Sequence, residues 1–274
     1  MNIHATQGET PAHQRAKAEI MRACGTAGYE AVAEFAGDGW RADVLASRGD
    51  VRIAFEVQWS FLKLRDTLAR QRRYAEAGVR GCWFFRHPPA QITARRDLPL
   101  FHLYANADDS FTISLNGTMH PFEVFVTRLL QGRVRFCETA QIAPQQTINI
   151  GFYALRCPHC GQPAHRHRIE SALHTGCGYG IAPPEDQAFL ALPEVRAAVA
   201  PLYRAEPTLQ PLSDGEICPH CGTPFSASQL ELAHYGVQPV LTRALDLRLR
   251  HPLRLSGDAA HHWCCPDTMT SGCG

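Results

Sequence analysis

The alternation of apolar and polar positions in the first 90 residues predicts a helix, three strands, a second helix and a fourth strand. Thr10-Pro11 is a typical helix start, and apolar residues recur at helical spacing as far as about Cys24. The other elements are expected at 29–37, 40–46, 51–58, 61–78 and 79–87. The SRGD turn pairs the second and third strands as a hairpin, and the whole order predicts an α/β fold.

Beyond Pro88-Pro89 the pattern is weaker. Two further strands and a helix are expected at 98–104, 110–117 and 120–132. The polar stretch 138–150 is interpreted as a linker, and cysteine pairs, histidines and proline-rich connectors follow it. We therefore expect two domains, 1–140 and a smaller α+β module at 151–274, the second with a helix near 193–204.

Composition and charge narrow the class of protein. The 274 residues are 45% hydrophobic and 19% charged, as in a globular protein, and the net charge of +1 gives no overall signal for nucleic acid. Locally, residues 61–96 contain nine Lys or Arg and two acidic residues, a stretch that either meets phosphates or forms a solvated helix face. Because no signal-like segment or membrane-length apolar run is seen, we expect a soluble, cytoplasmic protein with no membrane partner.

Two acidic residues lie inside otherwise apolar strands. A buried charge is costly unless it is paired, and the hairpin brings Asp43 close to Glu56, with Gln58 on the same face as Glu56. Two neighbouring carboxylates repel each other unless a cation lies between them, and their oxygens suit Mg²⁺ or Mn²⁺. In the alternative interpretation, Asp43 pairs with Arg41 or Arg52 and Glu56 faces solvent.

Over residues 9–87 the chain resembles the competence protein CoiA-like family of the PD-(D/E)XK, restriction-endonuclease-like nucleases. The residues that carry the likeness are His13 and Lys17 on the first helix, Asp43 in RADVL, Glu56, Gln58 and Ser60 in IAFEVQWS, then Arg70, Tyr74 and Trp83. The resemblance implies a restriction-endonuclease-like core with the order helix, three strands, helix, strand.

The resemblance also implies a metal-dependent nuclease that cleaves DNA in uptake, recombination or defence. Asp43 and Glu56 would hold Mg²⁺ or Mn²⁺, which activates water and offsets charge on the phosphate. Gln58 stands where most of the superfamily has a lysine; glutamine can orient a water but carries no charge. Lys17 either supplies the missing charge or is a surface lysine, and His13 is either catalytic or structural.

The arginine-rich helix at 61–78 is the candidate contact for nucleic acid. Its candidate binding residues are Lys63, Arg70, Arg73 and Tyr74. Arginine makes bidentate contacts with phosphate, and tyrosine can stack or form a hydrogen bond.

Two CPHC pairs in the second half predict a zinc site. The simplest interpretation is one zinc ribbon formed by Cys157, Cys160, Cys218 and Cys221. In a two-site alternative, the first pair is completed by His174 and Cys177, and the second by His261 and Cys264 or by His262 and Cys265. Cys24, Cys82 and Cys137 are interpreted as ordinary buried residues.

Three functions follow from these features. The first is a Mg²⁺- or Mn²⁺-dependent nuclease with a zinc module, DNA as substrate and protein partners from a DNA-processing pathway. The second is a catalytically inactive nuclease fold that binds nucleic acid, which the missing lysine at Gln58 favours. The third is a zinc-ribbon adaptor whose N-terminal domain is a scaffold. Retention of Asp43 and Glu56 favours the enzyme.

Overall fold

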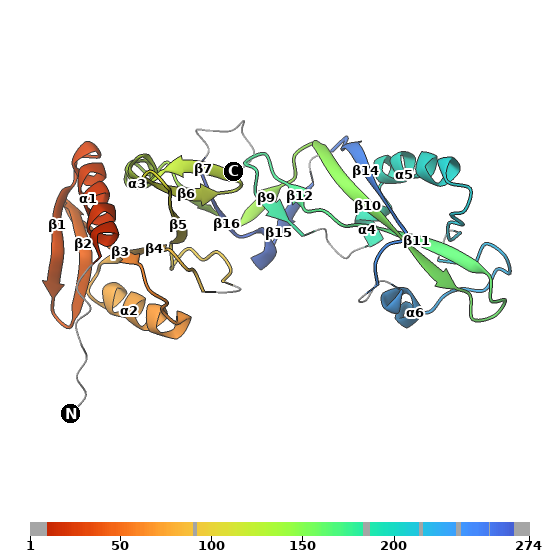
Figure 1. Cartoon of the computed structure of the whole chain (residues 1–274), viewed down its shortest axis with the longest axis horizontal. Coiled ribbons are helices and arrows are strands. Elements are labelled where there is room, and N and C mark those ends of the chain that lie inside the picture. Colours follow the sequence, from red (N-terminus) through yellow and green to blue (C-terminus); the bar gives the residue numbers. More distant parts are fainter. Residues whose placement is uncertain are drawn as a thin grey trace, which may run out of the picture. The chain divides into compact units, whose positions relative to one another are not determined.

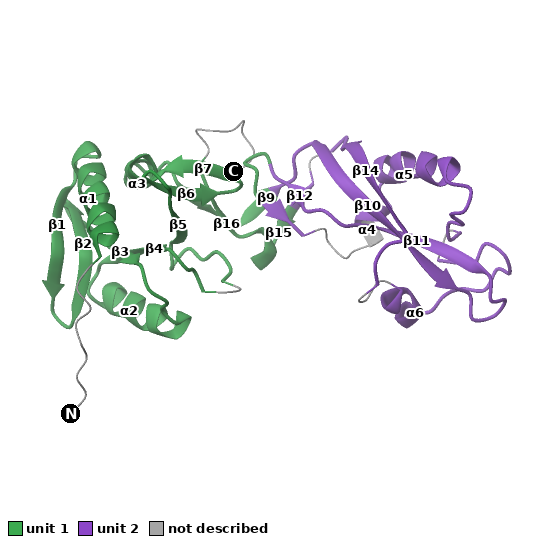
Figure 2. Ribbon diagram, viewed as in Figure 1, with its two compact units in different colours: residues 1–140, 176–179, 255–274 green, residues 141–175, 180–254 purple. Residues whose placement is uncertain are grey.

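The computed structural model forms two compact units (Figure 2). The structure describes residues 10–89, 92–182, 187–213, 216–233, 237–251 and 253–265. Unit 1 contains residues 1–140, 176–179 and 255–274, and unit 2 contains residues 141–175 and 180–254. The stretches 176–179 and 255–274, which were expected in the second module, therefore belong to unit 1.

Unit 1 is built on a seven-stranded sheet in which the strands follow one another in sequence order (Figure 1). The strands are β1 (Glu30–Gly37), β2 (Trp40–Arg48), β3 (Val51–Gln58), β4 (Arg80–Phe85), β5 (Leu100–Ala105), β6 (Phe111–Leu115) and β7 (Thr118–Pro121). The pairs β3–β4 and β4–β5 are parallel and the others antiparallel. The parallel step from β3 to β4 requires a crossover, which the second helix provides.

Helices cover both faces of this sheet. The helices of unit 1 are α1 (Pro11–Thr26), α2 (Leu64–Glu76) and α3 (Phe122–Leu130). Helices α1 and α3 share one apolar core with Val44 and Phe55 of the sheet, whereas α2 packs through Tyr74 into a second core with Leu45 and Trp83. The sheet therefore separates α1 from α2, and side chains of β2 and β3 can reach either helix.

The predicted order of helix, three strands, helix and strand is confirmed. The Thr10 side chain accepts a hydrogen bond from the His13 backbone, as its expected role at the helix start requires. One element differs: the helix expected at 120–132 begins only at Phe122, because His120 is buried and pairs with Ile113 as part of strand β7.

Unit 2 contains a three-stranded sheet in the order β11–β10–β14. Its elements are β10 (Gln145–Arg156), β11 (Pro163–Ile169), β12 (Leu173–His174), β13 (Gly180–Ile181), α4 (Gln187–Leu190), α5 (Pro193–Ala205), α6 (Ala227–Leu232) and β14 (Leu241–Arg248). Helix α5 confirms the helix expected near 193–204. The linker expected at 138–150 is wrong, because Gln146, Ile148 and Ile150 are buried on one side of the central strand β10.

Short elements complete the chain. They are β8 (Arg135–Cys137), β9 (Thr139–Gln141), β15 (Arg254–Ser256), the 3₁₀ helix η1 (Asp258–Ala260) and β16 (His262–Cys264). Strands β8 and β16 pair antiparallel within unit 1. Among the described residues, every helix is too short or too polar to cross a lipid bilayer.

Candidate active site and metal centre

Three acidic residues lie beside one another on neighbouring strands of unit 1. The β1–β2 register pairs Ala33 with Val44 and Phe35 with Ala42, so Glu34 lies level with Asp43 between these two pairs. The β2–β3 ladder ends one residue short of Asp43 and Glu56, which therefore also lie beside each other. Glu34 was not a candidate from the sequence, yet its backbone φ of 54° is in the left-handed region that residues other than glycine rarely adopt. Such irregular backbone is frequent at functional sites.

Glu56 is the most enclosed of the three acids, with 2% of its surface exposed. Arg70 on α2 donates from Nη2 to Glu56 Oε2 at 2.6 Å, and the Tyr74 hydroxyl contacts Glu56 Oε1. Burial raises the pKa of Glu56 to about 7; Arg70 opposes this rise and the nearby Asp43 charge adds to it. The alternative interpretation, in which Glu56 faces solvent, is therefore wrong.

The Tyr74 hydroxyl has one proton to donate, but two neighbouring oxygens can accept it. The first is Glu56 Oε1. The second, 2.6 Å from the hydroxyl, is the backbone carbonyl oxygen of Arg41, which can only accept. Burial and the neighbouring Glu56 raise the pKa of Tyr74, so the hydroxyl keeps its single proton. If Tyr74 donates that proton to Arg41, a proton on Glu56 supplies the second hydrogen bond. This geometry agrees with the raised pKa of Glu56.

Asp43 has its partners on the side of α1. Its Oδ2 accepts a hydrogen bond from the Val57 backbone at 2.7 Å and lies 3.3 Å from His13 Nε2. The Asp43 and His13 side chains are each 19% exposed, so both reach water. His13 is thus placed in direct contact with one candidate metal ligand.

Lys17, which could supply the missing charge, and Gln58, which stands in place of the lysine, each have partners other than Glu56. The Lys17 ammonium pairs with Glu34, whose other oxygen pairs with Arg41. The Gln58 amide donates to the Ser60 carbonyl at 2.9 Å and lies 3.2 Å from the Ser60 hydroxyl. The cation in contact with Glu56 is therefore Arg70, and Lys17 neutralises the acid that neighbours Asp43.

The donor types of this region suit a hard divalent cation. Mg²⁺ and Mn²⁺ need one or two carboxylates, with water and phosphate oxygens completing the shell. Asp43 and Glu56 are the residues that would hold such an ion. Glu56 would first have to lose its proton and exchange the contacts with Arg70 and Tyr74, so the structure has the site in a closed form.

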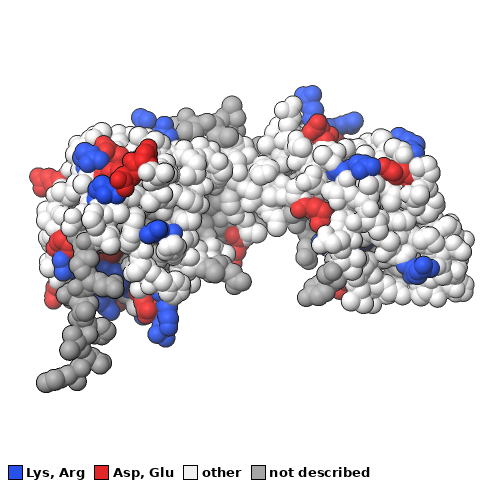
Figure 3. All heavy atoms as spheres, viewed as in Figure 1, with Lys and Arg blue, Asp and Glu red and all other residues white. Residues whose placement is uncertain are grey.

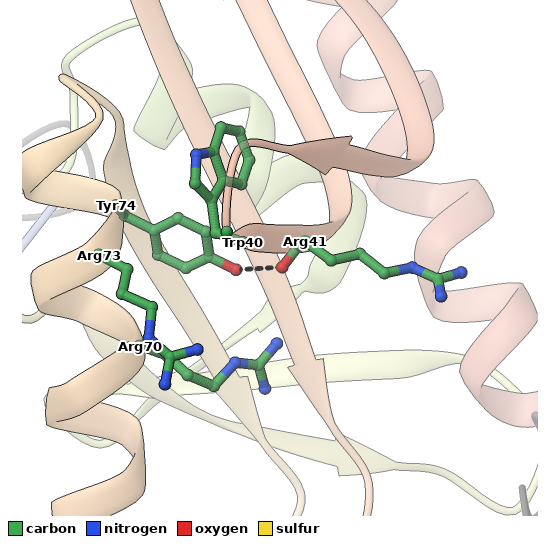
Figure 4. A pocket seen from close by; sticks show the side chains of 6 residues that line it. Trp40, Arg41, Arg70, Arg73 and Tyr74 are labelled. Carbon is green, nitrogen blue, oxygen red and sulfur yellow. Dashed lines mark hydrogen bonds between the residues drawn. The ribbon is translucent and has the colours of Figure 1, made fainter.

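A pocket of about 330 Å³ opens next to this acid group. Figure 4 shows Arg70 and Arg73 of α2 on one side of it, and Trp40 above the Tyr74 ring. The Trp40 and Tyr74 rings meet edge to face, with centroids 5.4 Å apart. Guanidinium groups beside aromatic rings are suited to a phosphate and a base.

The nucleic-acid residues predicted from the sequence are partly gathered here. Arg70, Arg73 and Tyr74 line the pocket, whereas exposed Lys63 lies at the start of α2 and does not. Trp40 was not predicted as a pocket residue, although its position directly after a glycine turn, at the start of a hairpin strand, was a signal. Arg41 contributes its backbone, since its side chain points away (Figure 4). On the face drawn in Figure 3, acidic and basic side chains lie intermixed.

The two CPHC pairs come together in unit 2. The Sγ atoms of Cys157, Cys160, Cys218 and Cys221 all lie within 4.8 Å of one another. Cys157 and Cys221 are 3.6 Å apart, and Cys160 and Cys218 are 3.8 Å apart. A tetrahedral zinc ion with Zn–S bonds of about 2.3 Å separates its sulfurs by about 3.8 Å. This group of four cysteines could hold a metal ion with little movement.

Hydrogen bonds prepare at least one of these sulfurs as a thiolate. The Thr223 hydroxyl, 3.4 Å from Cys221 Sγ, and the Thr223 backbone lower the pKa of Cys221 to about 6. At Cys160, the Gln162 backbone lowers the pKa, but burial and the neighbouring sulfurs together raise it to about 12. Four crowded thiols thus resist full ionisation, and a cation removes that obstacle.

The alternative pairing of each CPHC with a later histidine and cysteine is wrong. The two CPHC pairs complete each other, and His262 lies beside Cys177. Cys24 and Cys82 are buried, as expected. Cys137 is not an ordinary buried residue, because its sulfur is 3.1 Å from that of Cys264.

Comparison with protein families gives one match. Residues 9–107 match the model of the competence protein CoiA, nuclease-like domain. Comparisons with curated proteins and with solved structures give no match. The matched segment contains α1, the strands β1–β5 and α2, and with them the three acids and the pocket. The N-terminal part of the chain is thus similar to the nuclease-like domain of the CoiA family.

Proposed function

We propose that the protein is a Mg²⁺- or Mn²⁺-dependent nuclease that cleaves DNA phosphodiesters. The proposal rests on the buried Glu56, which lies beside Asp43 and next to an arginine-lined pocket within a nuclease-like domain. A protein that only binds nucleic acid gains nothing from an acid next to the phosphates, because the acid repels them.

In this proposal each residue has a distinct task. A divalent ion held by Asp43 and Glu56 would lower the pKa of a bound water and offset charge on the phosphate. Arg70, which pairs with Glu56 in the structure, would then be available to join Arg73 in holding a substrate phosphate. His13 orients Asp43 from the side of α1.

A nuclease fold without cleavage is the second candidate, and one observation favours it. The Gln58 amide is turned to Ser60, and Lys17 is paired with Glu34, so neither presents a charge to Glu56. On this alternative the pocket binds nucleic acid, and the Arg70–Glu56–Tyr74 contacts are a permanent part of the core.

The four-cysteine group of unit 2 is proposed to hold a structural zinc ion. Four sulfur ligands leave no open position for substrate, so this ion would stabilise folding and not take part in catalysis. Protein partners from a DNA-processing pathway are also part of this proposal.

The test is incubation of the full chain with single-stranded, duplex and branched DNA, and with RNA, in Mg²⁺, Mn²⁺ or EDTA. We expect cleavage that requires the metal and is lost in Asp43→Ala. The matched control is Asp50→Ala, in the turn after β2, which should cleave as the wild type does. A protein that binds DNA with a steep salt dependence but cuts none of these substrates would support the binding module instead.

A further inference from the structure

A second group of metal-type ligands lies in unit 1. It consists of Cys137, Cys177, His262 and Cys264, hereafter the Cys₃His cluster. These residues come from β8, from the stretch 176–179 and from β16. The four-cysteine group of unit 2 is complete without them, so the Cys₃His cluster needs its own explanation.

Strand geometry brings three of the four ligands together. His262 is paired with Cys137 across the β8–β16 ladder, so both side chains point to the same face. Cys264 is two residues after His262 and therefore lies on that face too. The ligand atoms of these three residues all lie within 4.8 Å of one another, and the Cys137 and Cys264 sulfurs are 3.1 Å apart.

The fourth ligand arrives from a distant part of the sequence. Cys177 Sγ lies 3.3 Å from His262 Nε2. A tetrahedral zinc ion places its sulfur and nitrogen ligands about 3.6 to 3.8 Å apart. The Cys137–Cys264 and Cys177–His262 distances are slightly shorter than this, so the ligand atoms of each pair have to move apart to admit an ion.

The surroundings prepare His262 and Cys177 for a metal. His262 Nδ1 lies 2.7 Å from the Ala260 carbonyl oxygen, which can only accept, so Nδ1 carries a proton and Nε2 is the nitrogen that would bind an ion. The Tyr179 ring stacks on the imidazole at 4.3 Å and 3°, which fixes the orientation of the ring. Asn116 Nδ2 is 3.6 Å from Cys177 Sγ, as a donor to a thiolate would be.

Three of the four residues of the cluster are buried and shielded from water. His262 and Cys264 are each 1% exposed, and Cys177 is 9% exposed. A disulfide between Cys137 and Cys264 would need the sulfurs about 1 Å closer, and it would leave His262 and Cys177 without a role. Four ligands of zinc type, with the histidine held by a second hydrogen bond, match a closed structural site.

We propose that Cys137, Cys177, His262 and Cys264 bind a structural zinc ion in unit 1, separate from the zinc of the four-cysteine group. The ion joins the stretches 176–179 and 255–265 to the nuclease-like unit, to which they belong although they lie far away in the sequence. Because each stretch contributes a ligand, the ion explains why both belong to unit 1 and not to the C-terminal module.

The test is the zinc content of the full-length, untagged chain, purified without oxygen and measured by mass spectrometry of the metal. We expect wild type to carry zinc at both clusters. Cys177→Ser and His262→Ala should each lose one of the two ions, Cys218→Ser should lose the other, and the double variant Cys177→Ser/Cys218→Ser should lose both. His262→Cys should keep both ions, since it restores four ligands.

Two controls separate ligand loss from damage to the fold. Cys265→Ala removes a buried thiol next to Cys264, and Cys24→Ala removes one from α1; both should keep both ions. Cys218→Ser loaded with Co²⁺ should show the thiolate–cobalt bands of a tetrahedral site, and His262→Ala in the same background should abolish them. Folded Cys177→Ser or His262→Ala with wild-type zinc, folded Cys218→Ser without metal, or a Cys137–Cys264 disulfide would overturn the proposal.

Discussion

The Tyr74 hydroxyl contacts a carboxylate oxygen of Glu56 on one side and, at 2.6 Å, the carbonyl oxygen of Arg41 on the other. One phenolic proton cannot satisfy both acceptors, so the arrangement favours a protonated Glu56. Helix α2 therefore holds the candidate metal ligand in a closed form, and both protons and metal ions should control whether it opens.

The first prediction concerns the pH dependence of stability in EDTA. Burial raises the pKa of Glu56 from 4.5 to about 7, so the folded state favours its protonated form. This contribution to stability is fully present below about pH 4.5 and is lost as the pH rises through about 7. Glu56→Gln imitates the protonated form and should not lose it.

Relative to wild type, Glu56→Gln should gain up to about 3 kcal/mol of unfolding free energy between pH 4.5 and 8, measured with urea. Glu34→Gln is the matched control. The pKa of Glu34 is lowered by its hydrogen bonds with Lys17 and Arg41, which outweigh burial, so its difference from wild type should not move in the same direction. Parallel pH profiles for Glu56→Gln and wild type would contradict a protonated Glu56.

The second prediction compares two neighbouring arginines of α2. Arg73 lines the pocket and forms no ion pair with any described residue, whereas exposed Arg72 does not line it. Arg73→Ala should weaken DNA binding and reduce the slope of log affinity against log salt by about 1, as expected for one lost phosphate contact. Arg72→Ala should change both quantities less. Equal effects in fluorescence anisotropy would show that the helix binds only as a diffuse charge.

The third prediction separates metal binding from chemistry at Gln58. If Gln58 orients the attacking water, Gln58→Ala should slow cleavage by roughly 10²-fold and leave the affinity for Mn²⁺ unchanged. Ser60→Ala should be nearly silent, because the Ser60 backbone carbonyl still accepts from the amide at 2.9 Å. Single-turnover cleavage and Mn²⁺ titration measure the two effects. An unchanged rate in Gln58→Ala would remove this residue from the mechanism.

The fourth prediction concerns the four-cysteine group. Removal of zinc with a strong chelator should increase amide hydrogen exchange around Cys157 and Cys218, whose apolar neighbours include Phe225 and Leu230. Exchange in β3 and β4 should rise much less, because these strands belong to unit 1. Uniform loss of protection in both units would mean that this group is not a local zinc module.

Most of the nuclease-like unit could be predicted from the sequence, because its signals are local. The Thr10 cap, the apolar runs of β2 to β4 and the turn after Arg48 each report on a few consecutive residues. The acids stood out for the same reason: a carboxylate within an apolar strand is visible without knowledge of the fold. The CPHC pairs were visible because each pair supplies half of a site.

The rest depends on pairing between distant segments. Glu34 joins the acids only through the β1–β2 register and an unusual backbone angle. Strand β10 begins with polar residues, so its sequence looks like that of a linker. Its role as a central strand is evident only from its pairing with β11 and β14. Cys137 lacks a local motif and the spacing of Cys177 suggested His174 as its partner, so only the three-dimensional structure brings Cys177 to His262 and Cys137 to Cys264.

The most direct measurement of the central claim is single-turnover cleavage of one labelled DNA in Mn²⁺ by wild type and by Glu56→Gln. Glutamine keeps the size of Glu56 and can still meet Tyr74 and Arg70, but it binds a divalent ion poorly. We predict metal-dependent cleavage by wild type and a rate lower by roughly 10²-fold or more in Glu56→Gln, with DNA affinity in EDTA unchanged. Equal cleavage by both proteins, or none by wild type with intact DNA binding, would contradict a nuclease centred on Glu56.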